Sequence, residues 1–528
     1  MNITIPINTI FLQKVKKYLQ QLPLQRILAV VAIALSITAT IYAYRQDVII
    51  TYGDAESHLD IAKRVVNGLT PGIAQLGGIW LPLPHLLMVP LVYFDPLWRT
   101  GFAGSIVSGI CFVISAVFIY KLCLLLTKDT GASLIAFLVF ALNPNMLYMQ
   151  ATPMTELPLI IFFILSSYYF IKNLYQEADY FSLILAAFFG FCATLSRYDG
   201  WFLVGIEATI IFLRYIWHKK KWERLQGRLI LFATLAFFGV ILWLLWDQLI
   251  LGDALYFTHS QFSANAQQKG WLAKGQLPAY HNIGLSFLYY FVTAMSNTGI
   301  IIFCIALVGF IAYLLQKKYK DRFYIVLLML APFIFYVLTL YVGQSIIFIP
   351  DLTPGWFESN LFNVRYGIMM VPFVSLFVGY LFSRCQFPGK TVVISLLIFQ
   401  VLLFGIGYSR VMTLADGKTG LSQAKRPDAE RWLAKHYDHG LVLLDDYSRL
   451  TSVIRSNIPM QHVIYIGTKP YWEESLSAPE KYATWIIIQK NDDVWKHIYA
   501  NPTMRARLYK YFRKDYTSPD ILIFKRDY

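Results

Sequence analysis

The sequence predicts a multi-pass α-helical membrane protein with about eleven transmembrane helices and a small C-terminal exoplasmic α/β domain. Hydrophobic residues make up 57% of the 528-residue chain, charged residues only 15%, and the mean hydropathy is +0.51. No soluble core needs so large a share of apolar side chains. Apolar stretches long enough to cross about 30 Å of hydrocarbon recur up to residue 409, and charged residues are concentrated after it.

The predicted spans follow one another with short polar connections between most of them. They lie near residues 27–44, 101–126, 131–149, 156–171, 181–196, 200–217, 229–250, 285–315, 323–342, 364–383 and 391–409. The segment 46–100 is too long for a simple hairpin between two spans, so we expect it to lie along the membrane surface. Within it, the proline-broken apolar stretch Trp80–Leu87 predicts an interfacial helix.

Charge asymmetry predicts the orientation, because Lys and Arg collect on the cytoplasmic side. With a cytoplasmic N-terminus, the cytoplasmic segments of residues 1–409 carry 19 Lys and Arg against 5 acidic residues, and the remainder carries 8 basic and 12 acidic residues. The cytoplasmic lysines include Lys14, Lys16, Lys17, Lys219, Lys220, Lys221, Lys317 and Lys318. The net charge of +15 is then a topology signal, and no nucleic-acid partner is expected. We expect a multi-pass protein of the cell (plasma or inner) membrane.

A change of composition near residue 410 predicts two domains, a transmembrane domain over 1–409 and a soluble exoplasmic α/β domain over 410–528. Of 77 charged residues, 33 lie in the last 119 positions. Short β-type runs alternate there with helical patterns. The expected strands are 441–444, 462–466, 484–488 and 521–524, and the expected helices are 428–436 and 501–512. The domain shows no phosphate-binding loop and no zinc spacing, which suggests a lid or an acceptor-docking module.

An acidic motif, Tyr52–His58, directly follows the first apolar stretch. Carboxylates at the mouth of a membrane span are costly to bury and often mark a substrate or proton site. Helical periodicity runs from Glu56 to Asn67, which places Asp54 just before the first turn. Asp54 is therefore a candidate base and equally a candidate N-cap.

Three further polar segments map to the same exoplasmic face. One ends in Glu156 at the start of a predicted span, and the others are Ser196–Trp201 and Asn363–Gly367. They add a second carboxylate and two arginines, Arg197 and Arg365. Each Arg could instead reach the interface or pair internally, as with Asp199. Two carboxylates and two guanidiniums on one face can remove a proton and hold a phosphate.

The order of these segments resembles that of the GT-C integral-membrane glycosyltransferases. It reads GDAESH, LPLPHLL, NPNMLYMQATPMTELP, LSRYDGWFL and NVRYGIMMVP, and covers most of residues 26–409. More narrowly, it is similar to the branch of the protein O-mannosyltransferases and the lipid A aminoarabinose transferase. The resemblance implies a GT-C-type fold, and the C-terminal region resembles exoplasmic domains appended to such enzymes.

What the resemblance implies is an inverting transfer of a monosaccharide from a polyprenyl-phosphate carrier to an exoplasmic acceptor, which is a lipid, glycan or protein. Asp54 would be the general base, with Glu56 and Glu156 as supporting acids. Arg365 and Arg197 would face the lipid phosphate. Further expected substrate contacts are Tyr366, His58, His85, Lys269 and Tyr256.

Two departures from the family pattern bear on these roles. The chain has Asp-Ala-Glu where the closest branch often has adjacent acids, which leaves the division of duties between Asp54 and Glu56 open. It also lacks a long inserted β-rich domain of the eukaryotic protein O-mannosyltransferase kind, which weakens a protein acceptor. No cofactor or metal is expected, although Asp54 and Glu56 could together bind a divalent cation.

The loop from Gly252 to Asn282 suits carbohydrate recognition, because amide and hydroxyl groups pair with sugar hydroxyls and aromatic rings offer stacking faces. Its polar and aromatic members are Tyr256, His259, Gln261, Asn265, Gln267, Gln268, Lys269, Trp271 and Lys274. The alternative is a surface loop with interfacial aromatics. For the whole chain, the alternative function is a transporter or lipid flippase, whose family traits are internal repeats and ionisable groups near the bilayer midplane.

Overall fold

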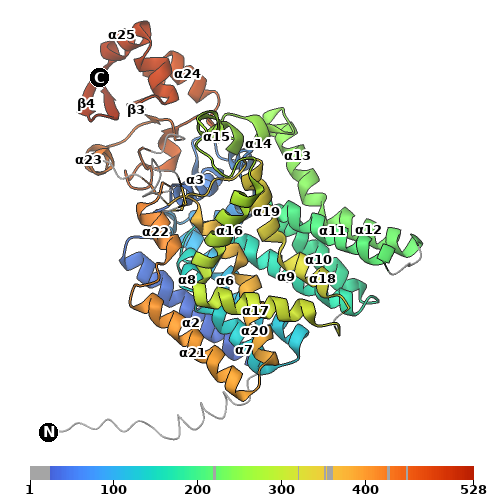
Figure 1. Cartoon of the computed structure of the whole chain (residues 1–528). Helices are drawn as coiled ribbons and strands as arrows, with labels where there is room; N and C mark the ends of the chain where they lie inside the picture. Colours follow the sequence, from blue (N-terminus) through green and yellow to red (C-terminus); the bar gives the residue numbers. More distant parts are fainter. Residues whose placement is uncertain are drawn as a thin grey trace, which may run out of the picture.

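The computed structural model describes residues 24–217, 222–318, 320–349, 352–353, 361–421, 423–424, 428–446 and 450–527. A large helical part is followed by a small α/β part that contains the C-terminus (Figure 1). The predicted fold class, helical with a small C-terminal α/β domain, is confirmed. The domain boundary near residue 410 stays a prediction. The lysines at 14, 16, 17 and 219–221, which carry part of the charge argument, lie outside the described residues.

Six helices of the described residues are long and apolar enough to cross a membrane without a break. They are α2 (Leu24–Arg45), α6 (Phe102–Thr127), α9 (Glu156–Tyr175), α11 (Asp199–Trp217), the continuous pair η2 (Val364–Met370) and α20 (Val371–Arg384), and α21 (Phe387–Gly405). Shorter apolar helices are α4 (Leu83–Val92), α7 (Thr130–Ala141) and α10 (Tyr180–Thr194). The chain is thus a multi-pass membrane protein.

Three more candidate spans are pairs of helices with a bend between them. They are α12 (Trp222–Ala236) with α13 (Phe238–Leu251) at 41°, α16 (Ile283–Thr298) with α17 (Ile300–Leu315) at 112°, and α18 (Arg322–Met329) with α19 (Ala331–Tyr341) at 50°. If each pair is one span, the described part has up to nine. The predicted number of about eleven stays a prediction.

The apolar stretch 285–315 is not the single helix that its composition predicts. The chain turns sharply at Gly299, whose φ of +88° favours glycine. A Cβ at this position would lie 2.7 Å from the side chain of Gln400 on α21. Gln400 Oε1 accepts a hydrogen bond from the amide of Ile301 at 3.1 Å, so the start of α17 is satisfied by a neighbouring helix.

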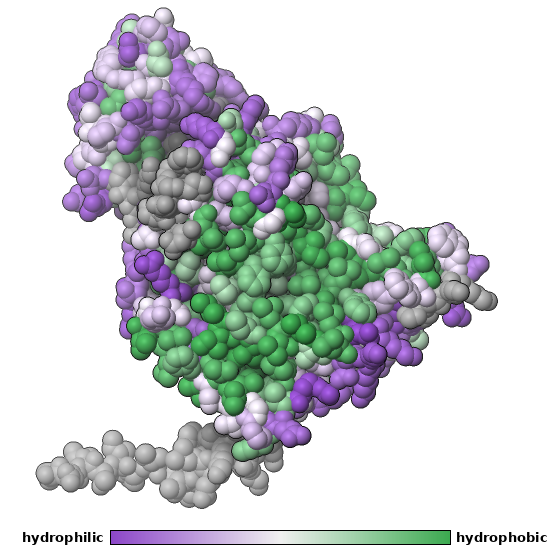
Figure 2. All heavy atoms as spheres, viewed as in Figure 1, coloured by the Kyte–Doolittle hydropathy of each residue, from purple (hydrophilic) through white to green (hydrophobic). Residues whose placement is uncertain are grey.

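Figure 2 shows an apolar band around the middle of the helical part, with polar surface on the C-terminal α/β part and along the opposite rim. The helices α2 and α21 contribute many exposed apolar side chains to the surface, among them Ile33, Ile37, Ile398 and Phe399. By contrast, most residues of α9 and α20 are buried inside the helical part. This arrangement is that of a helix bundle whose outer helices face lipid.

The predicted surface segment begins with α3 (Gly53–Asn67), which lies between the helical and α/β parts (Figure 1). It also contains η1 (Ile73–Leu76), α4 and α5 (Asp95–Thr100). The α3 and α4 helices are tied together by Lys63, whose Nζ donates to the carbonyl of Val92 at 2.8 Å. The remaining short helices of the helical part are α8 (Pro144–Met149), α14 (Tyr256–His259), α15 (Ala264–Ala273) and α22 (Met412–Thr419).

The C-terminal part is a five-stranded sheet in the order β2-β1-β3-β5-β4. The strands are β1 (Val442–Leu443), β2 (Val463–Ile464), β3 (Trp485–Gln489), β4 (Phe512–Thr517) and β5 (Ile521–Arg526). β1 is parallel to β2 and β3, whereas β5 is antiparallel to β3 and β4. The accompanying helices are α23 (Asp428–His436), α24 (Tyr471–Ser477) and α25 (Pro502–Tyr511), with short turns at Met460–His462, Pro479–Lys481 and Trp495–Tyr499.

Each of the four predicted strand regions overlaps a strand, and β4 is an additional one. Its run Phe512–Thr517 includes Arg513, Lys514 and Asp515, and only Phe512 is buried. A charged strand at the edge of a sheet shows little apolar alternation, which is why the sequence pattern did not reveal it.

Candidate active site

The site lies where several helices begin. Glu156 is the first residue of α9, Asp199 is the first residue of α11, and Asp54 lies in the first turn of α3. The amino end of a helix carries a partial positive charge, so each of these positions stabilises a carboxylate. The three helix starts lie close together, because Arg365 contacts both Asp54 and Glu156, and Arg197 contacts both Glu156 and Asp199.

The N-cap interpretation of Asp54 is wrong. The α3 helix starts at Gly53 rather than at Glu56, and its N-cap is Tyr52, which makes no side-chain cap bond. Asp54 therefore lies inside the first turn, and its carboxylate pairs with Arg365, from a segment far along the chain.

Arg365 joins two of the carboxylates. Its Nη2 donates to Asp54 Oδ2 at 2.8 Å, and its Nε donates to Glu156 Oε1 at 3.1 Å. The Arg365 side chain is 3% exposed and that of Glu156 is fully buried, whereas the Asp54 side chain is 25% exposed. Asp54 is therefore the member of this trio that solvent or substrate meets first, with Arg365 directly behind it.

Arg197 adds a second guanidinium on the other side of Glu156. Its Nη1 lies 3.3 Å from Glu156 Oε1 and donates to Thr155 Oγ1 at 3.0 Å. Its Nε lies 3.5 Å from Asp199 Oδ1, so the internal Arg197–Asp199 pair exists within the cluster. Tyr336 closes this side, because its hydroxyl donates to Asp199 Oδ2 at 2.7 Å and accepts from Arg197 Nη2 at 3.3 Å.

Aromatic rings fix the planes of both arginines. The Tyr366 ring centroid lies 5.2 Å from the guanidinium carbon of Arg365 and 5.3 Å from that of Arg197. Tyr52 lies 5.1 Å from Arg365, and Tyr336 stacks on Tyr366 with centroids 4.9 Å apart. Cations over ring faces are stabilised electrostatically, and more so away from water.

Three buried polar atoms of the cluster have no hydrogen-bond partner among the described residues. They are Arg365 Nη1, Glu156 Oε2 and Arg197 Nε, of which the last lies 3.5 Å from Asp199 Oδ1. An unsatisfied polar group in the interior typically costs about 1 to 3 kcal/mol, and a charged group costs more. Arg365 Nη1 and Glu156 Oε2 thus offer a donor and an acceptor to a polar ligand that enters beside Asp54.

The two acids of the Asp-Ala-Glu motif face different partners. Glu56 Oε1 accepts from Arg455 Nε at 2.9 Å, and Arg455 belongs to the C-terminal part. Residues two apart on a helix point to different sides, which separates Glu56 from Asp54. Among the described residues, no group of three or more His, Cys, Asp or Glu side chains could hold a metal ion.

His58 and His85 form a buried pair between α3 and α4. Their Nδ1 and Nε2 atoms lie 2.9 Å apart, and the Trp80 ring packs on His58 with centroids 4.6 Å apart. Burial lowers the pKa of His85 to about 4, so this imidazole is neutral at pH 7. Both side chains are almost fully buried, His58 on α3, which also carries Asp54, and His85 on the adjoining α4.

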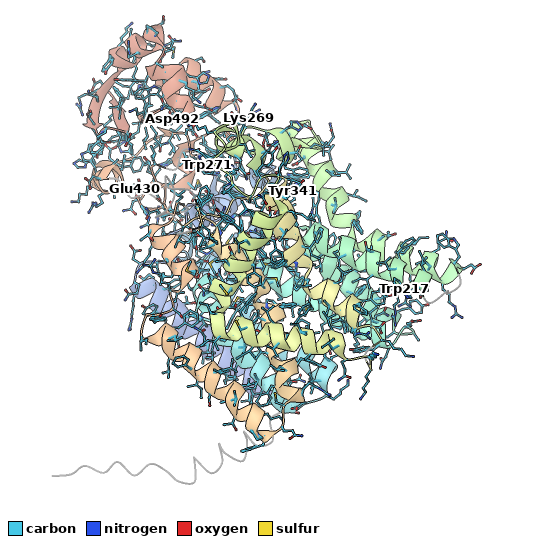
Figure 3. The ribbon with its side chains drawn as sticks, in the orientation of Figure 1. Trp217, Lys269, Trp271, Tyr341, Glu430 and Asp492 are labelled. Atoms are coloured by element: carbon cyan, nitrogen blue, oxygen red, sulfur yellow. The ribbon has the colours of Figure 1, made fainter. Side chains whose placement is uncertain are left out.

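The loop residues Tyr256 and Lys269 are not part of the cluster around Arg365. Tyr256 packs against Gly78 and interacts electrostatically with Asp247. Lys269 is exposed on α15, at the end of the helical part near the C-terminal sheet (Figure 3). Within the part of the chain that the structure describes, no hydrogen bond or ion pair joins either side chain to the Arg365 cluster. The Trp271 ring packs edge-on against Phe348 at 5.7 Å.

Sequence reasoning did not identify Tyr336, Tyr52 or Arg455. Tyr336 lies in an apolar helix with other aromatic residues, and Arg455 lies in the C-terminal part, far along the chain from its partner Glu56. Neither position has a local pattern that marks it. Tyr52 had a signal, since it immediately precedes the acidic turn, but its contact with Arg365 depends on tertiary structure.

Together, the described helices and the cluster define a multi-pass membrane protein with a polar site where several of its helices begin. Residues 98–246, which include Glu156 and Arg197, match the family model described as dolichyl-phosphate-mannose-protein mannosyltransferase. No curated protein sequence matches the chain.

Solved structures match almost the whole chain. ArnT from Cupriavidus metallidurans bound to undecaprenyl phosphate aligns over 94% of this chain and 97% of its own, with a TM-score of 0.57 and 10% identity. Its apo state gives a TM-score of 0.55 with 11% identity over the same shares. The Archaeoglobus fulgidus oligosaccharyltransferase gives 0.52 with 10% identity, over 95% of this chain and 74% of its own. The resemblance predicted from the order of the motifs is therefore confirmed.

Proposed function

We propose that the chain is an inverting glycosyltransferase that moves a monosaccharide from a polyprenyl-phosphate carrier to an acceptor on the exoplasmic side. The observation that carries this proposal is the cluster in which the partly exposed Asp54 pairs with the buried Arg365. The fold likeness to an ArnT that binds undecaprenyl phosphate supports a lipid-linked donor. The match to a mannosyltransferase family model supports the transfer of a sugar.

In the proposed reaction, Asp54 accepts the proton of an acceptor hydroxyl or amine as that group attacks the anomeric carbon. The bond from the anomeric carbon to the carrier phosphate breaks on the opposite face, and the polyprenyl phosphate leaves with the bonding electrons. The ion pair with Arg365 favours the carboxylate form of Asp54, which is the form that accepts a proton.

The leaving phosphate gains negative charge, and Arg365 is the group that can stabilise it. Its Nη1 is unpartnered among the described residues, and Tyr366 and Tyr52 hold its plane. Preorganised donors aimed at developing charge contribute strongly to catalysis in a site that excludes water. Glu156 and Arg197 lie behind and keep Arg365 in place.

The test compares donors for the purified protein in detergent. A panel of undecaprenyl-phosphate monosaccharides is offered beside the matching nucleotide sugars, with extracted membrane lipids as acceptor. We expect one lipid-linked sugar to be consumed and its nucleotide form to be ignored. Arg365→Lys keeps the charge but loses planar bidentate bonding, so donor use should fall about 10- to 100-fold, and further in Arg365→Ala.

Arg228→Lys is the matched control, because Arg228 is equally buried but binds Asn173 and Glu177 on α9 and its following turn. It should leave donor use unchanged. Transfer from a nucleotide sugar without lipid, or normal use of the lipid donor by Arg365→Ala, would show that the proposed mechanism is wrong.

A further inference from the structure

A network of buried side-chain amides lies beneath the site. Asn145 on α8 donates through Nδ2 to the carbonyl of Asn297 at 3.0 Å, at the end of α16. Asn297 donates through its own Nδ2 to the carbonyl of Val364 at 2.7 Å. Both amides are completely buried, and neither belongs to the cluster of charges described above.

The same Asn145 also reaches the start of α22. Its Oδ1 accepts from the backbone amide of Thr413 at 2.9 Å and from the Thr413 hydroxyl at 3.0 Å. The carbonyl of Thr413 in turn accepts from the Tyr52 hydroxyl at 2.5 Å. The Asn145 side chain therefore donates through Nδ2 to the end of α16 and accepts through Oδ1 from the start of α22.

The two branches end on either side of the Arg365–Asp54 ion pair. Val364 is the residue before Arg365, and Tyr52 is two residues before Asp54. The ring of Tyr52 lies 5.1 Å from the Arg365 guanidinium, so the network closes on itself at the site. The network thus connects two segments whose residues Asp54 and Arg365 form an ion pair although they are 311 positions apart in the sequence.

Backbone packing supports the same interpretation. A Cβ on Gly367 would lie 2.4 Å from Asn297 Nδ2 and from the carbonyl of Thr293, so η2 rests directly on α16. The 112° turn after α16 places the Asn297 carbonyl where both Asn143 and Asn145 can donate to it. In a buried environment, such directional bonds hold segments in one relative position more strictly than apolar contacts do.

We propose that Asn145 is a positioning residue that sets the distance between the base Asp54 and the phosphate-binding Arg365, and this rests on the proposed function. Asn145 touches neither substrate nor the reacting atoms. Its two branches fix η2 and the start of α3 against each other. A displacement of about 1 Å in such a site can lower turnover about 100-fold.

The test measures backbone hydrogen–deuterium exchange together with kinetics, using the full chain in detergent and undecaprenyl phosphate as the probe of binding. In Asn145→Ala, exchange should become up to about 10-fold faster in both 50–56 and 361–370, because Thr413 and Asn297, which bind these segments, each lose their buried hydrogen bond to Asn145. Asn297→Ala should affect 361–370 alone, and Tyr52→Phe should affect 50–56 alone.

With the lipid-linked donor found for the wild type, Asn145→Ala should lower kcat about 10- to 100-fold and change KM and undecaprenyl phosphate affinity less than 3-fold. Asn173→Ala is the control, since this buried amide donates to the carbonyl of Asp179 at the far end of α9. It should leave both segments and kcat unchanged.

Unchanged exchange in both segments of Asn145→Ala would overturn the inference, as would a uniform rise across all helices. If Asn145→Ala does not fold, the separate effects of Asn297→Ala and Tyr52→Phe decide the question. If the wild type uses no lipid-linked sugar, the proposed function has failed, while the exchange pattern still decides whether Asn145 positions the two segments.

Discussion

Asp54 and Glu156 both lie in the first turn of a helix, yet their surroundings give them different capacities. Asp54 is partly exposed and has one arginine, whereas Glu156 is fully buried between Arg365 and Arg197. A base must reach the acceptor, and only an exposed carboxylate can do so. The geometry thus favours Asp54 as base and Glu156 as the group that orders the arginines.

Asp54→Asn should lower turnover about 10²- to 10⁴-fold, because it removes the base and keeps nearly the same shape. Folding should change little, since the N-cap of α3 is Tyr52. The measurement is turnover per folded molecule, with undecaprenyl phosphate affinity measured beside it. Asp520→Asn, at an exposed carboxylate of the C-terminal part, should behave as wild type. Near-normal turnover in well-folded Asp54→Asn would remove Asp54 from the mechanism.

The buried histidine pair predicts a pH dependence of stability. The pKa of His85 is lowered to about 4 from an ordinary value near 6.5, so the unfolded chain binds a proton that the folded chain resists. Stability is then fully present above pH 6.5 and is lost as the pH falls toward 4, by about 3 kcal/mol at the lower end.

His85→Gln keeps a neutral polar group and removes this titration. The fall in Tm between pH 6.5 and 4 should therefore be smaller than in the wild type, as measured by thermal unfolding in detergent. His439→Gln, at an exposed position in the C-terminal part, should leave the fall unchanged. An identical pH profile in wild type and His85→Gln would contradict the neutral buried imidazole.

For individual residues, the sequence could show which side chains lie on the same membrane face, but not which of them form hydrogen bonds or ion pairs with one another. Asp54, Glu156, Arg197 and Arg365 each follow or begin an apolar stretch, so their common end was predictable. The pairing of Glu56 with Arg455 could not be predicted, because it joins positions that are 399 residues apart in the sequence. Nothing local to either residue specifies that contact.

At the level of elements, α3 is held from two sides. Arg365 binds its first turn, and Arg455 of the C-terminal part binds Glu56 and the carbonyl of Ile50 at 3.2 Å. Arg64 near its other end pairs with Asp446 after β1. The helix that carries Asp54 is thus fixed between the membrane part and the sheet.

Arg455→Ala should therefore loosen α3 and reduce turnover about 10-fold, since it removes the Arg455 ion pair from the buried Glu56. In a double-mutant cycle with Glu56→Gln, thermal unfolding should give a coupling of about 1 to 3 kcal/mol. Arg513→Ala, which breaks an exposed pair with Asp515, should change stability by less than about 0.5 kcal/mol. Additive effects of Arg455→Ala and Glu56→Gln would show that the contact is not coupled.

Periodicity predicted most elements because membrane helices satisfy their own backbone bonds wherever the sequence is apolar. It did not predict the turn at Gly299, where the apolar composition continues on both sides. There the cause is tertiary, since Gln400 from another helix binds the amide of Ile301. The predicted interfacial helix at Trp80–Leu87 begins later, at Leu83, and extends to Val92.

At the scale of the whole molecule, three spans run away from the site. The α9 helix begins at Glu156, α11 begins at Asp199, and the η2–α20 pair begins beside Arg365. With 20 residues, α9 is about 30 Å long, which matches the hydrocarbon core. The site and the C-terminal sheet thus lie on one side of the membrane, and Lys172 and Arg384 at the other ends lie on the opposite side.

The charge rule assigns the site and the sheet to the exoplasmic side, and cysteine labelling tests this assignment. In a variant whose five native cysteines are replaced, Ser477→Cys on exposed α24 should react with a membrane-impermeant maleimide in intact cells stripped of any outer barrier. Ser475→Cys, two residues earlier but fully buried, should stay unlabelled before and after lysis. Lys318→Cys, in a loop at the opposite end, should label only after lysis.

A lipid-linked donor is delivered to the exoplasmic face, whereas nucleotide sugars are cytoplasmic, so this orientation decides which donor can reach Asp54. Protection of Ser477→Cys until lysis, with early labelling of Lys318→Cys, would place Asp54 inside and contradict both the topology and the lipid-linked donor.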